Sequence, residues 1–100
     1  MKVRFLQSGG FAGIIKGCEL DSATLSPDAA QDLEGLIRDS GISGSGEFLS
    51  DTGRDLQQYE IRIEDGNLKS SVVFDDMSVP HSARPLLGFL KKHARPKAAE

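Results

Sequence analysis

The sequence predicts an α+β fold in which a four-stranded antiparallel sheet carries two helices on one face, in the order β-β-α-β-β-α. Three observations lead to this expectation: apolar residues that alternate with polar ones near the N-terminus and over residues 59–74, a helix start at residues 26–28, and a helical apolar repeat near the C-terminus. Amphipathic helices and half-buried strands each have one apolar side, so two helices on the same face cover the sheet.

The first two predicted strands form a hairpin. Apolar and basic side chains alternate over residues 1–7, as in a half-buried strand, and residues 14–20 give the returning strand. The connection is the segment SGGFAG, residues 8–13, whose glycines tolerate positive φ. Phe11 in this segment either folds back onto the core or is presented to a partner, and the residues alone leave both interpretations open.

The first helix is predicted over Pro27–Ser40. Ser26 can accept a hydrogen bond from a free backbone N–H, Pro27 suits the first helical position, and Asp28 complements the helix dipole. Gly41 supplies the C-terminal stop. The apolar residues that recur on one face are Ala29, Leu33, Leu36 and Ile37.

The second half of the chain repeats the order hairpin, then helix. Residues 40–53 are rich in Gly, Ser and Asp and are expected to form a mobile loop. Residues 59–63 alternate between apolar and charged side chains, residues 65–67 form a turn, and residues 68–74 return as the fourth strand.

A final helix is expected after Ser82, which is placed to cap it, and Pro85 falls in its first turn, where a missing N–H is harmless. Its apolar face consists of Ala83, Leu86, Leu87 and Leu90. The prediction is therefore a single domain over residues 1–93, followed by a flexible tail over residues 94–100.

This topology brings three irregular segments to one end of the sheet. The first strand runs toward residues 8–13, the first helix returns residues 40–53 to the same end, and the fourth strand delivers residues 75–80 there. Loops that meet on a rigid sheet commonly build binding surfaces. This end is the candidate site.

Composition and charge limit the class of protein. With 100 residues, 38% hydrophobic and 27% charged, the chain can bury a core without disulfides, and a net charge of -3 disfavours nucleic acid and anionic membranes as partners. Cys18 is the single cysteine, and the N-terminus has no apolar run typical of a secretory signal. These features favour the cytoplasm.

No residue pattern indicates an enzyme or a bound cofactor. His81 and His93 have no nucleophile motif beside them, and with Cys18 they do not give the spacing of a zinc site. The glycines of residues 41–46 follow a helix, whereas those of a phosphate-binding loop precede one. The basic residues in 91–97 lie where the helix dipole alone favours positive charge.

The chain resembles the emfourin family of protein inhibitors along nearly its whole length. SGGFAG directly after an N-terminal strand is the most specific element. The other matching segments are Glu19-Leu20-Asp21 and Leu25, Tyr59-Glu60-Ile61, Asp75-Asp76 with Val79-Pro80, and Arg84-Pro85-Leu86-Leu87. The middle loop departs from the family, whose members often carry proline where this chain has Gly and Ser.

The resemblance implies a bacterial cytosolic protein without enzymatic activity that inhibits protealysin-like zinc metalloproteases of the thermolysin family. It does not locate the contact surface, so the site follows from the residues. Such a protease holds zinc with an open coordination position beside an apolar pocket. A carboxylate that replaces the zinc-bound water, together with an apolar side chain in the pocket, would block it.

The residues predicted to contact the protease are Ser8, Gly9, Gly10, Phe11, Ala12, Gly13, Asp75, Asp76, Met77 and Ser78. Asp76 or Asp75 is expected to approach the zinc, with Asp21 as the alternative at the other end of the sheet. Phe11, Met77 or Phe48 would fill the apolar pocket. The protein is expected to act as a monomer. A generic protein-interaction domain, or less readily a small nucleic-acid-binding module, fits the same sequence.

Overall fold

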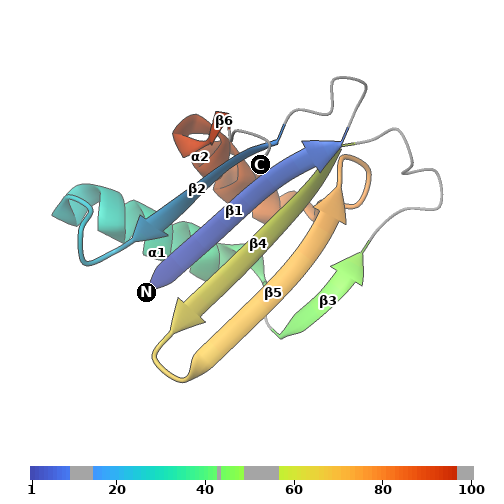
Figure 1. Ribbon diagram of the computed structural model, residues 1–100. Helices are drawn as coiled ribbons and strands as arrows, with labels where there is room; N and C mark the ends of the chain where they lie inside the picture. The colour runs from blue at the N-terminus through green and yellow to red at the C-terminus, as the bar shows by residue number, and fades with distance from the viewer. Residues whose placement is uncertain (10–14, 43, 49–56, 97–100) are drawn as a thin grey trace.

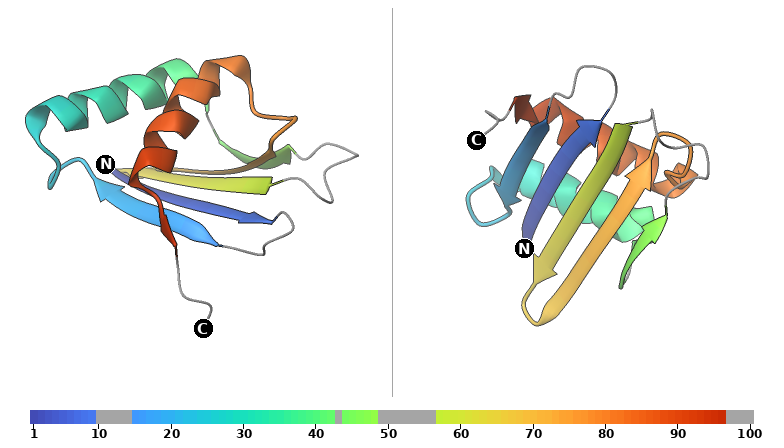
Figure 2. Two further views of the ribbon diagram at one scale, coloured as in Figure 1. Left: turned by 90° about the horizontal axis from the view of Figure 1, so that it is seen from above. Right: turned by 45° about the vertical axis from the view of Figure 1, so that its right-hand side comes forward.

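One sheet with two helices on a single face forms the part of the chain that the computed structural model describes, residues 1–9, 15–42, 44–48 and 57–96 (Figures 1 and 2). The expected α+β fold with both helices on one face is confirmed. The elements in chain order are β1 Lys2–Gly9, β2 Lys16–Asp21, α1 Pro27–Ser40, β3 Ser45–Phe48, β4 Gln57–Asp65, β5 Leu68–Asp75, a 3-10 turn His81–Ala83, α2 Arg84–His93 and β6 Arg95–Pro96.

The described sheet has six strands in the order β3-β5-β4-β1-β2-β6. The expected four-stranded sheet and the order β-β-α-β-β-α were wrong because they lacked β3 and β6, and the sheet is mixed because β3 is parallel to β5. The four expected strands form its antiparallel centre. β3 was missed because it has only four residues in a Gly- and Ser-rich stretch, and it pairs in parallel with β5. β6 lies in the segment expected to be a tail, and it adds Pro96 at the sheet edge, where a missing N–H is tolerated.

Strand register aligns the apolar residues of the central strands. Phe5 lies opposite Cys18 on one side and Ile61 on the other, and Ile61 lies opposite Val72. The β4–β5 hairpin closes at Gly66, whose φ of 61° suits a tight turn. The predicted turn at residues 65–67 is confirmed.

The first helix matches its prediction at both ends. The Oγ of Ser26 accepts a hydrogen bond from the N–H of Ala29 at 3.2 Å, and Pro27 occupies the first turn. Gly41 follows the helix with a φ of 76°, a conformation that other residues adopt at a cost. Leu33 is fully buried on the inner face of the helix.

The start of the last helix differs from its prediction. Ser82 does not cap α2; a 3-10 turn precedes the helix, and the Oγ of Ser82 donates a hydrogen bond to the carbonyl oxygen of Ser40 at 2.8 Å. The hydroxyl thus satisfies a carbonyl at the end of α1, and it joins the two helices. The apolar face was predicted correctly, because its four residues are buried.

Both helices and the inner face of the sheet share one core. Its buried residues are Val3, Phe5, Leu20, Leu33, Tyr59, Ile61, Ile63, Val72, Phe74, Val79, Ala83, Leu86, Leu87 and Leu90. No helix of the described residues lies on the opposite face of the sheet (Figure 2).

Candidate functional site

Strands β1, β3 and β5 end, and strands β2 and β4 begin, at the same end of the sheet, which we call the loop end. Its described residues are Ser8, Gly9, Ile15, Phe48, Gln57 and the segment from Asp75 to Ser78. Gly9 at the end of β1 pairs with Gln57 at the start of β4, and Asp75 at the end of β5 pairs with Gln58. β3 ends there too, since Phe48 pairs with Phe74 (Figure 1). The described ends of β1, β3 and β5 therefore lie at one end of the sheet, as the predicted topology requires. The site residues Gly10, Phe11, Ala12 and Gly13 lie outside the described residues.

Asp75 is fully buried and shapes the turn that follows β5. Its Oδ1 accepts a hydrogen bond from the N–H of Met77 at 2.9 Å, while its own N–H donates to the Oγ of Ser78 at 2.9 Å. The carboxylate therefore faces the protein. This placement does not present Asp75 to a partner, unlike the sequence-based expectation that either aspartate would reach outward.

Asp76 lies at the surface, and two hydrogen-bond donors on β4 hold its carboxylate. Its Oδ1 accepts a hydrogen bond from the hydroxyl of Tyr59, and its Oδ2 accepts one from the N–H of Gln57 at 3.3 Å. Burial, followed by the hydrogen bond and the charge of Asp76, raises the pKa of Tyr59 well above its ordinary value. The phenol therefore stays protonated at neutral pH and acts as a donor to the carboxylate.

Two further side chains complete this arrangement. The amide of Gln7 donates to the side-chain oxygen of Gln57, so β1 supports β4 at the loop end. The ammonium of Lys91, on α2, lies 4.8 Å from the ring centroid of Tyr59, a cation–π geometry. We refer to Gln7, Gln57, Tyr59, Asp76 and Lys91 as the Tyr59 cluster.

Exposed apolar side chains gather at the loop end. Four large apolar side chains of the described residues are exposed: Ile15 (41%), Phe48 (51%), Met77 (68%) and Leu68 (74%). The first three lie at the loop end, whereas Leu68 follows the β4–β5 turn at the opposite end. Because this end carries three exposed apolar side chains as well as the surface carboxylate of Asp76, it is the candidate surface for binding another protein.

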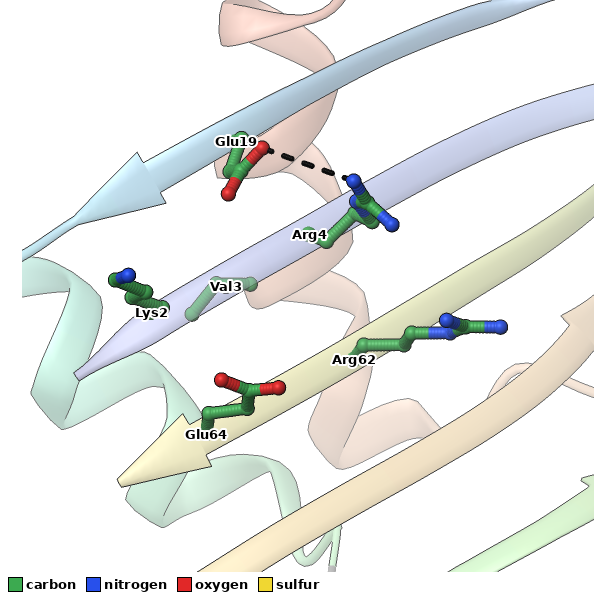
Figure 3. A pocket seen from close by; sticks show the side chains of 6 residues that line it. All are labelled: Lys2, Val3, Arg4, Glu19, Arg62 and Glu64. Atoms are coloured by element: carbon green, nitrogen blue, oxygen red, sulfur yellow. Dashed lines mark ion pairs between the residues drawn. The ribbon is translucent and has the colours of Figure 1, made fainter. Parts of the chain in front are cut away.

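The uncovered face of the sheet carries charges of both signs. A depression of about 210 Å³ is lined there by Lys2, Val3, Arg4, Glu19, Arg62 and Glu64 (Figure 3). Arg4 and Glu19 approach to 3.9 Å, and Arg62 pairs with Glu60 at 2.6 Å. Because the opposite charges neutralise each other and are exposed, this depression does not favour a ligand of one charge.

The described residues include no group of three or more His, Cys, Asp or Glu placed to hold a metal ion. Neither helix in the described part of the chain is long and apolar enough to cross a membrane. Asp21, the alternative zinc contact, lies at the opposite end of the sheet, and its Oδ1 accepts from the N–H of Ala23 at 2.9 Å.

Comparison with known families decides which group of proteins this fold represents. The family model described as Emfourin matches residues 5–91, from β1 to α2, and so spans both helices and the loop end. The chain belongs to the Emfourin family. This match confirms the resemblance noted from the sequence. The Emfourin family is a family of protease inhibitors, which is consistent with a protein that is not an enzyme. Comparisons of this emfourin with curated proteins and with solved structures gave no match.

The support of Asp76 by Tyr59 was missed at the sequence level, although a signal for it exists. The register that pairs Asp65 with Leu68 and Tyr59 with Phe74 places Asp76 opposite Gln57. A buried tyrosine also needs a partner for its hydroxyl. Together these two facts indicate Asp76 as that partner.

Proposed function

We propose that this emfourin inhibits protealysin-like zinc metalloproteases of the thermolysin family by inserting its loop end into the active-site cleft. Membership of the Emfourin family supports inhibition of a protease. The main structural support for the proposal is the surface carboxylate of Asp76, which accepts hydrogen bonds from Tyr59 and Gln57 and directly precedes the exposed Met77.

The zinc ion of such a protease keeps one coordination position for water or substrate. In the proposed complex, an oxygen of Asp76 takes that position and displaces the water that would attack a peptide bond. Donors that hold a carboxylate from behind fix its orientation and strengthen a metal contact. Tyr59 and Gln57 have this role before the protease arrives, so little side-chain entropy is lost on binding.

Met77 provides the apolar part of the interaction. It is 68% exposed and follows Asp76 directly, so burying it in the pocket beside the zinc removes apolar surface from water. Phe11, from the SGGFAG segment, is the second apolar candidate. Ser8, Gly9 and Ser78 form the rim of the same surface.

The inhibitor escapes cleavage because a side chain, rather than a peptide carbonyl, occupies the open coordination position of the zinc ion. Hydrolysis requires a carbonyl in near-attack alignment with the water, and that water is absent once a carboxylate is bound. We propose that the protein acts in the cytoplasm as a monomer, where the single Cys18 remains reduced.

Titration of the protein into a thermolysin-family enzyme, and separately into a serine protease, tests the function. We expect cleavage of a peptide substrate to be slowed for the zinc enzyme alone. Equal activity of the zinc enzyme with and without the protein would contradict the proposal and favour a generic protein-interaction domain. Binding of nucleic acid that weakens with salt, and is lost when residues after Lys91 are deleted, would instead identify a nucleic-acid-binding module.

The zinc contact is tested with Asp76→Ala and Asp76→Asn, using Asp65→Ala at the far end of the sheet as the control. We expect both Asp76 variants to weaken inhibition by about tenfold or more, because neither keeps the carboxylate that binds zinc. The asparagine can still accept the hydrogen bond from Tyr59, so this variant tests the zinc contact separately from that hydrogen bond. Inhibition at full strength by Asp76→Asn would show that the carboxylate does not bind the metal. Weak inhibition by Asp21→Ala alone would move the site to the other end.

A further inference from the structure

An apolar pocket of about 160 Å³ lies between the end of α1, the edge strand β3 and the segment after β5. Its apolar walls are Ile42, Phe48, Val72, Phe74 and Pro80. Phe48 stands at the outer side, half exposed, with its ring stacked on that of Phe74 at a centroid distance of 5.5 Å. Among the described strands, β3 is the outermost on this side of the sheet (Figure 1).

The hydroxyl groups in the pocket wall already have partners. The Oγ of Ser40 donates to the carbonyl oxygen of Ile37 at 2.6 Å and accepts from the N–H of Ile42 at 3.2 Å. The Oγ of Ser78 accepts from the N–H of Asp75. Because these groups are engaged within the protein, the pocket favours an apolar group over a polar one.

The size of the pocket sets the size of that group. An apolar cavity of about 150 Å³ lined by Leu, Ile and Phe is known to take up benzene. The pocket has a similar volume, about 160 Å³, so it fits a side chain as large as that of leucine or phenylalanine.

The pocket is continuous with the loop end. Ser78 lines the pocket and also belongs to the turn that carries Asp76 and Met77. Phe48 forms the pocket wall and is one of the exposed apolar residues of the loop end. A protein that covers Met77 and Asp76 is therefore placed to cover the pocket as well.

We infer that this pocket receives an apolar side chain, of leucine or phenylalanine size, from the metalloprotease that the loop end blocks. The inference rests on the proposed function and adds a second contact, in which a side chain of the protease enters the inhibitor. Asp76 and Met77 enter the protease, while a side chain from the surface beside the protease cleft enters the inhibitor. Paired anchors of this kind concentrate binding energy at the centre of an interface.

Uptake of an apolar group is tested first on the free protein, with benzene as the probe. We expect benzene to shift the methyl NMR signals of Ile42 and Val72, and to leave those of Leu68 at the far end unchanged. Unshifted Ile42 and Val72 signals would overturn the inference whatever the protein inhibits.

The role of the pocket in the complex is tested by filling it. The chain has no tryptophan, so the indole of Ile42→Trp gives the only tryptophan fluorescence, and blue-shifted emission reports that it fills the pocket. We expect this variant to inhibit about tenfold less strongly than the wild type, because the protease side chain is excluded. Leu68→Trp is the matched control at the far end.

The outcomes separate the inference from the proposed function. A wild-type protein without inhibitory activity contradicts the function. A wild type that inhibits, together with an Ile42→Trp variant that fills its pocket and inhibits equally well, overturns only the inference.

An indole that stays in water also overturns the inference, because the pocket then rejects an apolar group offered at its wall. Dimers that dissociate in Leu68→Ser would assign the pocket to Leu68 of a second copy, and this too overturns the inference.

Discussion

The hydroxyl of Tyr59, a residue of the core, donates a hydrogen bond to the carboxylate of Asp76 at the surface. The ring of Tyr59 packs on Phe5, with centroids 6.3 Å apart, so the sheet helps to position the carboxylate that the turn presents. The rigid part of the fold therefore helps to determine where the proposed zinc contact lies.

Tyr59→Phe tests whether this hydrogen bond matters for inhibition. The substitution keeps the ring in the core and removes the hydroxyl, so we expect unfolding to become easier by about 1–2 kcal/mol. We expect inhibition to weaken by about tenfold, because Asp76 loses the donor that orients it. Urea denaturation and inhibition titrations measure the two effects. A variant that is less stable but inhibits normally would limit Tyr59 to a structural role.

The pKa of Tyr59 predicts how stability changes in alkaline solution. In the unfolded chain the pKa of Tyr59 has its ordinary value of 10.0, and in the folded protein it is higher. As the pH rises, the unfolded chain therefore loses the phenol proton before the folded protein does. The contribution of Tyr59 is therefore fully present below pH 10.0 and declines as pH rises toward the folded pKa. Unfolding free energies measured in urea across this range should fall with pH.

Tyr59→Phe is the control for this pH dependence, since lysines titrate in the same range. The variant should show a smaller decline than the wild type. Tyr59 is the only tyrosine, so phenolate absorbance follows its ionisation directly. Phenolate that forms near pH 10.0 in the folded protein would contradict the burial and the Asp76 hydrogen bond.

The N-terminal cap of α1 gives a prediction for stability alone. Ser26→Ala removes the acceptor for the N–H of Ala29 and should cost about 1 kcal/mol, whereas Ser26→Asn should largely preserve stability. Both variants should inhibit normally, because the start of α1 lies at the end of the sheet opposite the loop end. Thermal unfolding and inhibition assays check the pair. Equal stability of the two variants would show that the cap contributes little.

Local signals predicted the helices and central strands because each depends on residues close in sequence. The bounds of α1 follow from Ser26, Pro27 and Gly41, which act on their own backbone. β3 was not predictable in this way, since Ser45–Phe48 becomes a strand only through pairing with β5. Ser82 shows the same limit, because its partner is Ser40 in another helix.

The candidate site shows this division between local and tertiary information as well. Topology sufficed to bring the ends of β1 and β5 together, because strand directions and helix length determine it. The different roles of Asp75 and Asp76 were not predictable from two adjacent identical residues. The turn buries Asp75 and leaves Asp76 exposed, a distinction that depends on the hydrogen bonds of Ser78 and Tyr59.

Met77 and Leu68 provide a direct comparison of the two ends of the molecule. Both are exposed apolar residues, at 68% and 74%, so replacing either by serine should change the free energy of unfolding by no more than about 0.5 kcal/mol. Met77→Ser should weaken inhibition by about tenfold, because in the proposed complex this side chain enters the protease pocket, whereas Leu68→Ser should inhibit normally. Inhibition titrations and urea denaturation of both variants give the comparison. Equal inhibition by the two variants would remove Met77 from the interface and leave Phe11 and Phe48 as the apolar residues to test. A loss confined to Leu68→Ser would place the interface at the opposite end of the sheet.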